Sequence, residues 1–449
     1  MQSRSRYTLK LIAVALAGML ALGPVAAQDD GEERPEQKTK KAQAVSKAVY
    51  DKIQLAQERV DEKDYAGALK ILNALYNPDK LTEYEQANVL NYIGFVYYNQ
   101  DDIGGALRTY EKLLKIPELE PQLAKQTTYT VAQLYTMEEQ YEKALTTLDK
   151  WFLLETNPPP DAYILKAQNL YQVQRYKQMI QPIETAMEVA KARGKPAKED
   201  WYVLLNFAYF QDENYAKVRD IQKTLLASWP KKRYWMSLAG AFTELGEDRK
   251  LIYAYDVLHL QGLLDKDSEL VTMAQLYMQA EVPYKAGTLL EKEMETGRVS
   301  KNGKNYRLLS QAWQLAMEDQ KAIPALKEAA RLSDTGELHV RLGNAYLNVG
   351  KYSDCVTAVR AGISKGGLKA PDNAQISLGM CLYNERQYSN AIAAFRDAAK
   401  SPRSKRMADQ WIKVIDADIQ RNEQIRLAEA AATKKRKEIE ARRASAGRA

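Results

Sequence analysis

Small or apolar residues recur along the chain at intervals of 33 to 39 residues. They occupy ten positions: Ala68, Ala106, Ala144, Met179, Val218, Leu251, Ala286, Ala322, Cys355 and Ala391. A second small residue lies twelve residues before several of them, and these second positions include Gly94, Ala132, Ala167, Ala239, Ala274, Gly343 and Gly379. Small residues on two facing helices let the backbones approach closely. The pattern therefore predicts an all-α chain of ten helix pairs, in which neighbouring pairs cover each other's apolar faces.

Aromatic residues recur at fixed distances from these small residues, and two prolines fall within the same pattern. Three residues after the second small position stand Tyr97, Tyr135, Tyr209, Phe242, Tyr277, Trp313 and Tyr346. Three residues before the first small position stand Tyr65, Tyr141, Tyr176, Tyr215, Tyr352 and Tyr388. Pro182 and Pro324 interrupt two of the second helices, and we expect both near a first turn, where a missing amide costs least. Arg59 and Asp248 replace the aromatic residue in the first and sixth copies, which match least well.

The domain organisation follows from these patterns. We expect a signal peptide at 1–27, a disordered polar leader at 28–43 and the solenoid of helix pairs at 44–403. Residues 404–425 are expected to form a capping helix with Trp411, Ile415 and Ile419 on one face, because a terminal repeat has no neighbour on its outer side. A basic tail follows at 426–449.

The first 27 residues have the composition of an export signal. Arg4, Arg6 and Lys10 precede an apolar run over 11–22, and the small residues at 25–27 predict cleavage before Gln28. The run is too short for a membrane span, and no cysteine follows it for a lipid anchor. An amphipathic N-terminal helix is the alternative, but the run has no polar face. We therefore expect an exported mature chain with no transmembrane segment.

The charge distribution argues against nucleic acid as a partner. Without the three basic residues of 1–27, the formal charge falls from +7 to +4. The tail carries eight basic and three acidic residues, so residues 28–425 are nearly neutral, at −1. This body has no basic stripe for a phosphate backbone. The tail itself fits either a solvated helix end or an electrostatic contact with an anionic surface or partner.

The sequence lacks the residue patterns of catalysis. Its two histidines, His259 and His339, are 80 residues apart, in different repeats. No HExxH, CxxC or glycine-rich phosphate loop is present. We therefore expect no enzyme activity, no cofactor and no metal site.

The pattern resembles the tetratricopeptide repeat (TPR) over about 360 residues. The last two copies are the clearest, LGNAYLNVGKYSDCVTAV from Leu342 and LGMCLYNERQYSNAIAAF from Leu378. The resemblance implies an α-α superhelical solenoid that binds proteins. In such an array the second helix of one repeat packs on the first helix of the next, which brings Cys355 near Cys381. In an oxidising compartment we expect these two to form a disulfide, the alternative being two buried small apolar residues.

The resemblance also implies where a partner would bind, because the first helices of this family line the concave groove. The positions that would point into it are Asn91, Phe95, Tyr98, Asn99, Tyr129, Gln133, Gln168, Tyr171, Phe207, Phe210, Gln275, Gln311 and Tyr383. Amides and aromatic rings suit an extended peptide segment. A more basic stretch of Lys304, Arg307, Arg341 and Asn344 is a candidate for holding a carboxylate, although its spacing differs from that of the family's known carboxylate clamp.

Several longer strings resemble one bacterial subfamily, the periplasmic TPR protein encoded beside TonB-, ExbB- and ExbD-type components in proteobacteria. They are KEDWYVLLNFAYF from Lys198, WPKKRYW from Trp229, ELVTMAQLYMQAEVPYKAGTLLEKEM from Glu269 and SKRMADQW from Ser404. This resemblance implies an accessory role in energised uptake across the outer membrane, with a TonB-type transducer as the partner. A periplasmic scaffold for envelope assembly or polysaccharide export is the alternative.

Overall fold

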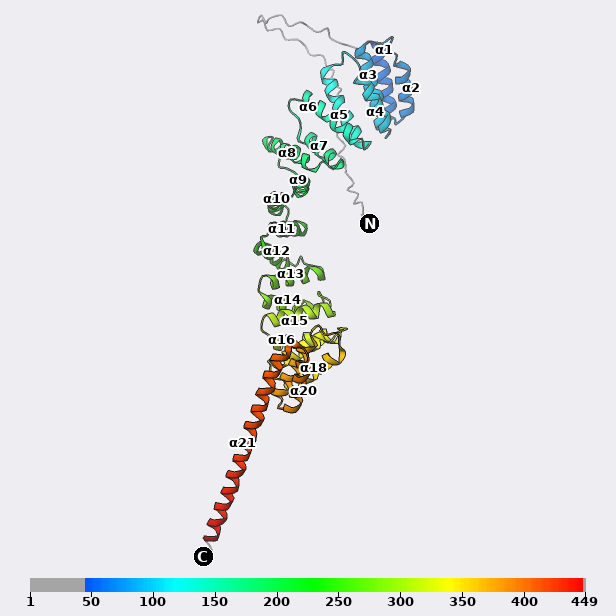
Figure 1. The fold of residues 1–449 in the computed structure, drawn as a ribbon. Coiled ribbons are helices and arrows are strands. Elements are labelled where there is room, and N and C mark those ends of the chain that lie inside the picture. Colours follow the sequence, from blue (N-terminus) through cyan, green and yellow to red (C-terminus); the bar gives the residue numbers. More distant parts are fainter. Residues whose placement is uncertain (1–44, 447–449) are drawn as a thin grey trace. The chain divides into compact units, whose positions relative to one another are not determined.

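The computed structural model describes residues 45–446 (Figure 1). The signal peptide and leader predicted from the sequence lie outside this range, as do the last three residues of the tail. Within residues 45–446 the regular structure is all helical, with no strand, which confirms the predicted fold class. No helix in this range is both long and apolar enough to cross a membrane.

The described helices form ten pairs followed by one long helix. The first helices are α1 (Lys47–Asp61), α3 (Glu83–Asn99), α5 (Pro121–Met137), α7 (Pro160–Gln172), α9 (Glu199–Gln211), α11 (Lys232–Glu244), α13 (Asp267–Gln279), α15 (Gly303–Leu315), α17 (Glu337–Asn348) and α19 (Pro371–Asn384). The second helices are α2 (Tyr65–Leu75), α4 (Ile103–Leu113), α6 (Tyr141–Leu154), α8 (Ile180–Ala192), α10 (Tyr215–Ser228), α12 (Asp248–Leu260), α14 (Pro283–Glu295), α16 (Asp319–Arg331), α18 (Tyr352–Lys365) and α20 (Tyr388–Ala399). The last helix is α21 (Pro402–Ala446).

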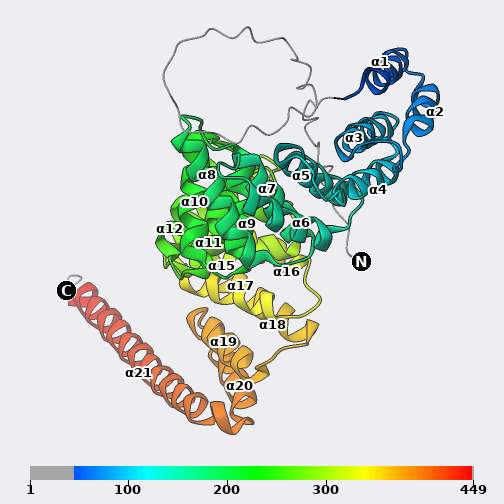
Figure 2. The same ribbon diagram turned by 90° about the horizontal axis from the view of Figure 1, so that it is seen from above.

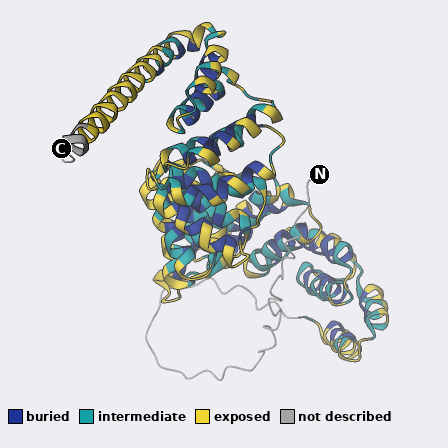
Figure 3. Cartoon of the chain, turned by 90° about the horizontal axis from the view of Figure 1, so that it is seen from below, coloured by how far each residue is buried: buried dark blue, intermediate teal, exposed yellow. Residues whose placement is uncertain are grey.

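The chain divides into two compact units, and the boundary lies inside α5. Unit 1 ends at Thr127 and contains α1 to α4, whereas unit 2 begins at Thr128 and contains α6 to α21. In unit 2 the helices from α9 to α16 lie one above another in chain order (Figure 1), and Figure 2 views the same helices from above. Buried residues face neighbouring helices within each unit (Figure 3).

The recurrent small residues lie where the two helices of a pair meet. Eight of the ten have no exposed surface, and Val218 and Leu251 are also buried. The second small position is equally tight. A Cβ added to Gly94 in α3 would lie 2.7 Å from the ring of Tyr110 in α4, and one added to Gly379 in α19 would lie 2.7 Å from the ring of Phe395 in α20. Glycine at these positions lets an aromatic ring of the second helix lie against the backbone of the first.

The two prolines inside second helices differ in position. Pro182 is the third residue of α8 and is preceded by a 3₁₀ turn, η1 (Tyr176–Met179). Because Pro182 has no amide hydrogen, an α-helical bond to the carbonyl of Gln178 cannot form there. Pro324 is the sixth residue of α16, so it lies in the second turn, one turn later than we predicted. Because Pro324 has no amide hydrogen, it cannot donate an α-helical hydrogen bond to the carbonyl of Gln320, which lies close to the start of that helix.

Each pair contains one left-handed residue between its two helices. Two of these are glycines, Gly246 and Gly350, and the other eight are Lys63, Asp101, Glu139, Gln174, Glu213, Glu281, Met317 and Arg386. All eight non-glycine residues are exposed. A left-handed residue just after a helix reverses the chain sharply and satisfies the last carbonyls. The turn conformation is therefore kept in every pair although its amino acid is not.

Carboxylates at the start of first helices tie consecutive pairs of unit 2 together. Glu199 accepts hydrogen bonds from Lys231 at 2.6 Å and from Arg233 at 2.6 Å, and the hydrogen bond from Lys231 is the main cause that lowers the pKa of Glu199 to about 2. Asp372 accepts from Arg403 and Ser404 at the start of α21, and these bonds hold its pKa well below the usual range. Each contact joins residues about one repeat apart.

The first part of α21 packs on the last helix pair. The ring of Trp411 stacks on Phe395 of α20 at a centroid distance of 5.7 Å, and Ile415 is fully buried. The Tyr383 hydroxyl of α19 donates to Asp418 at 2.6 Å. Past Ile419 the helix continues without a break, and every residue from Gln420 to Ala441 is exposed (Figure 3). One helix therefore spans the described parts of both the predicted capping segment and the predicted tail.

Candidate partner-binding surface

Two aromatic residues predicted for the groove, Tyr171 and Phe207, form a cluster with Tyr176 in unit 2. Tyr171 of α7 lies 5.1 Å from Phe207 of α9, and Tyr176 of η1 lies 5.1 Å from Phe207 and 5.8 Å from Tyr171, measured between ring centroids. All three are half-buried. Edge-on contacts of this kind keep aromatic rings rigid. The cluster therefore offers a preformed apolar surface between two consecutive first helices.

Exposed apolar side chains extend this cluster along α9. Phe210 is 50% exposed and its ring lies 5.8 Å from Tyr215 of α10, while Val203 is 38% exposed. Val203, Phe207 and Phe210 are spaced four and three residues apart, so they share one face of the helix. We call Val203, Phe207 and Phe210 the α9 strip. The α9 strip therefore presents neighbouring apolar side chains on one helix face that is partly open to solvent.

Several predicted amide side chains lie on neighbouring first helices with unused hydrogen-bonding capacity. Gln133, Gln168 and Gln311 are half-buried, and Gln275 is exposed. None of these four side chains has a hydrogen-bond partner within residues 45–446. Each amide can both donate and accept, which matches the backbone of an extended peptide.

The basic stretch brings two arginines of consecutive first helices together. Arg341 of α17 is half-buried, and burial, followed by the positive charge of Arg307 of α15, lowers its pKa. Arg341 donates to the side chain of Gln314. In the described part of the chain neither arginine forms an ion pair, and neither does Lys304. Asn344 is half-buried on α17. Such an arrangement favours an anionic group, because an anion would offset the repulsion between the two guanidinium groups.

Other predicted groove residues are occupied by packing or belong to unit 1. Tyr383 contacts α21 through Asp418, and its ring lies 5.5 Å from Trp411, so the capping helix covers it. The ring of Tyr129 lies 4.5 Å from Trp151, and burial raises the pKa of Tyr129 to about 12. The remaining four lie on α3 of unit 1: Asn91, Phe95, Tyr98 and Asn99.

Sequence reasoning missed Val203 and Asn206 on α9. Asn206 lies twelve residues before Val218, at the position where other copies have a small residue. Its side-chain oxygen is buried without a hydrogen-bond partner. The departure from the small-residue pattern was visible in the sequence and could have marked this helix as unusual.

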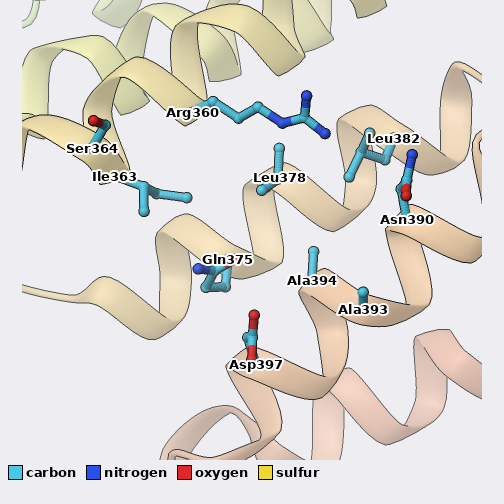
Figure 4. A pocket seen from close by; sticks show the side chains of 10 residues that line it. All are labelled: Arg360, Ile363, Ser364, Gln375, Leu378, Leu382, Asn390, Ala393, Ala394 and Asp397. Atoms are coloured by element: carbon cyan, nitrogen blue, oxygen red, sulfur yellow. The ribbon is translucent and has the colours of Figure 1, made fainter.

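Two hollows lie away from the α9 strip. One, of about 360 Å³, is lined by α18, α19 and α20, with Leu378 and Leu382 beside Arg360, Asn390 and Asp397 (Figure 4). The other, of about 380 Å³, includes Phe152 and Tyr163, whose rings stack at 4.8 Å. Both mix apolar and polar groups and are open to solvent. Their residues were not among those predicted from the sequence.

Groups with catalytic or metal-binding chemistry are scattered. His259 lies 3.2 Å from Glu293, and this buried carboxylate also accepts from Arg298. His339 lies in a different pair, and burial lowers its pKa. Among residues 45–446 no group of three histidine, cysteine, aspartate or glutamate side chains could hold a metal ion. His259 and Glu293 join α12 to α14 through this polar contact.

The two cysteines lie on consecutive pairs. The structure joins the sulfur of Cys355 on α18 to that of Cys381 on α19, with the Cα atoms 5.8 Å apart. This Cα separation is in the usual range for a disulfide. Both residues are fully buried. The bond remains a prediction for the protein in solution, where thiol labelling tests it.

Comparisons with known proteins are limited to solved structures. No protein-family model and no curated protein matches the chain. A TPR protein from Parabacteroides merdae is 16% identical, covers 67% of this chain and 99% of its own, and has a TM-score of 0.33. YrrB, described as a TPR protein with an unusual peptide-binding site, is 16% identical, with coverages of 43% and 97% and a TM-score of 0.35. MamA is 23% identical, with coverages of 37% and 88% and a TM-score of 0.32. At these identities and TM-scores the likeness is not evidence about partners.

Proposed function

We propose that this protein is an exported TPR-type interaction scaffold that binds an extended segment of a partner protein along the first helices of unit 2. The observation that carries the proposal is the α9 strip, where Phe210 is half exposed beside the rigid ring of Phe207. Aromatic side chains held in place by packing lose little entropy on binding and commonly dominate binding energy.

The amide side chains on other first helices of unit 2 favour an extended peptide over a compact surface. Such a segment presents its own amide and carbonyl groups along its length, and the unpartnered glutamines of unit 2 can meet them. The basic stretch at Arg307 and Arg341 would hold an acidic side chain or a terminal carboxylate of the same segment. The body of the chain is nearly neutral, so stacking and hydrogen bonding, more than long-range attraction, would supply the affinity.

The partner that we propose is the periplasmic part of a TonB-type transducer. The strings from Lys198, Trp229, Glu269 and Ser404 support it through their resemblance to the TonB-associated subfamily. Transducers of this kind carry proline-rich segments, and a polyproline II segment is extended before it binds. Export of this chain, which the proposal requires, is supported by the pattern of residues 1–27.

Replacing Phe210 with serine is expected to weaken binding to the recombinant periplasmic part of the transducer about tenfold, because the strip loses its most exposed ring. Isothermal titration measures the change. Tyr253→Ser is the matched control, since Tyr253 is 63% exposed but lies on the second helix α12. Equal loss in both variants, or none in Phe210→Ser, would place the binding surface elsewhere.

Deleting the gene is expected to reduce energised uptake across the outer membrane, measured as growth under iron limitation, without a general envelope defect. Complementation with the wild-type gene should restore growth, and complementation with the Phe210→Ser variant should not. Normal uptake together with altered cell shape or polysaccharide output would favour the alternative role in envelope assembly or polysaccharide export.

A further inference from the structure

The exposed part of α21 carries a row of residues that nothing in unit 2 covers. Past the contact of Ile415 with the last pair, positions spaced three or four apart share one helix face. This row, which we call the basic row, consists of Arg421, Ile425, Ala428, Ala432, Lys435, Arg436 and Ile439. All of its members are exposed, including Ile425 at 49% and Ile439 at 44%. Apolar and basic side chains are therefore combined on a face that is open to solvent.

Charge is segregated between the two sides of this helix. Between Gln420 and Ala441 there are six basic and four acidic residues. The basic row holds three of the basic residues and none of the acidic ones, which are Glu423, Glu429, Glu438 and Glu440. The remaining positions, of which Glu429 and Glu440 flank the row near Arg436, therefore have a net charge of −1, from three basic and four acidic residues, whereas the row has +3.

Ion pairs within α21 do not remove the positive charge of the basic row. Arg421 contacts Asp418 at 2.6 Å, and the Asp418 side chain is only 16% exposed. Arg436 contacts Glu440 at 3.1 Å, and this pair is exposed, so it contributes little free energy. Lys435 forms no ion pair within the described residues. Lys435 and Arg436 can therefore contact another anion at small cost.

The composition of the row argues against a second helix as its occupant. A coiled-coil seam needs apolar residues at nearly every contact position, and this row has two isoleucines among alanines and cations. A second copy of α21 would also place like charges against each other. A bilayer with anionic headgroups needs no matching register, and its phosphates attract basic residues on one helix face while isoleucine side chains reach the apolar boundary.

We propose that the basic row of α21 binds the surface of a membrane rich in anionic phospholipid, and that the opposite side, of mixed charge, faces water. The row spans roughly 27 Å of helix, at 1.5 Å per residue. The anchored start of α21 then holds the last helix pair beside the bilayer. This inference is independent of the partner proposed for the α9 strip.

The test compares two double charge reversals on opposite sides of the helix. Lys435→Glu with Arg436→Glu changes the basic row, and Lys434→Glu with Lys437→Glu makes the same change in net charge on the other side. The purified full chain without its predicted signal peptide is sedimented with vesicles of phosphatidylcholine containing about one-third phosphatidylglycerol. Vesicles of phosphatidylcholine alone are the neutral comparison. Circular dichroism shows whether each variant keeps its helical content.

We expect the wild type to bind the anionic vesicles only. The Lys435→Glu and Arg436→Glu variant should bind at least about 25-fold more weakly, since each basic residue near such a surface contributes about fivefold and the two glutamates are also repelled. The variant on the other side should lose less than about fivefold. Equal losses would overturn the oriented contact, and so would a wild type that does not bind. Sedimentation equilibrium showing a dimer that only the row variant abolishes would assign the row to a second copy instead.

Discussion

Replacing Gly362 with alanine is expected to destabilise the protein by about 3 kcal/mol, at the upper end of the usual cost of overpacking. Gly362 lies inside α18, and its added Cβ would lie 2.8 Å from the backbone oxygen of Gly336 and 2.8 Å from a methyl group of Val340 in α17. A flexible side chain could move aside, but the backbone of Gly336 cannot do so without shifting the start of α17. The two helices of the ninth pair would have to separate.

Gly240→Ala is the matched control, because Gly240 also lies inside a helix, α11, but an added Cβ meets nothing within 4 Å. Alanine is the better helix former, so this variant should gain up to about 1 kcal/mol. Urea titrations followed by circular dichroism compare the two with the wild type. A repeat solenoid can unfold in parts, so the loss should concern first the pairs around α17 and α18. A stabilising Gly362→Ala would contradict the close approach of these backbones.

Removing the bond between Cys355 and Cys381 is expected to cost about 3 kcal/mol, chiefly because the unfolded chain loses a closed loop. The two residues are 26 positions apart. The double variant Cys355→Ala with Cys381→Ala and the chemically reduced wild type should both unfold at lower urea concentration. The reduced wild type separates loss of the bond from loss of sulfur packing, since it keeps both side chains.

Thiol labelling decides whether the bond exists in the purified protein. Denatured and unreduced protein should bind no maleimide, and the same sample after reduction should bind two per chain. Two reactive thiols before reduction would leave only the alternative, two buried small apolar side chains, and reduction would then leave stability unchanged.

The helix pairs could be predicted closely because their signal is local. Ala106, Ala144 and the other recurrent small residues each report a helix contact formed within about 40 residues, so spacing alone identified ten pairs. The left-handed turn conformations were harder to predict from the sequence. Eight of the ten left-handed positions carry residues such as Met317 or Lys63, which give no glycine signal, and the surrounding helices impose the conformation.

The candidate surface could be predicted only in part. Tyr171, Phe207 and Phe210 were identified by register, and the structure places Tyr171 and Phe207 in contact, with Phe210 one turn away. Register could not show that Tyr383 is covered, because the covering residues Trp411 and Asp418 belong to a helix beyond the repeats. It also could not separate the α3 residues from those of unit 2.

The sequence by itself therefore determined the all-helical class, the number of pairs and the residues that pack within each pair. These depend on contacts between neighbours along the chain, which leave a periodic trace in residue size. Only the tertiary structure decided which surface residues stay open, how Gly336 and Gly362 bring two backbones together, and how far α21 extends beyond its last contact. The exposure of a side chain and the close approach of two backbones depend on every element that surrounds a residue. They therefore cannot be predicted from the spacing of residue types within one repeat.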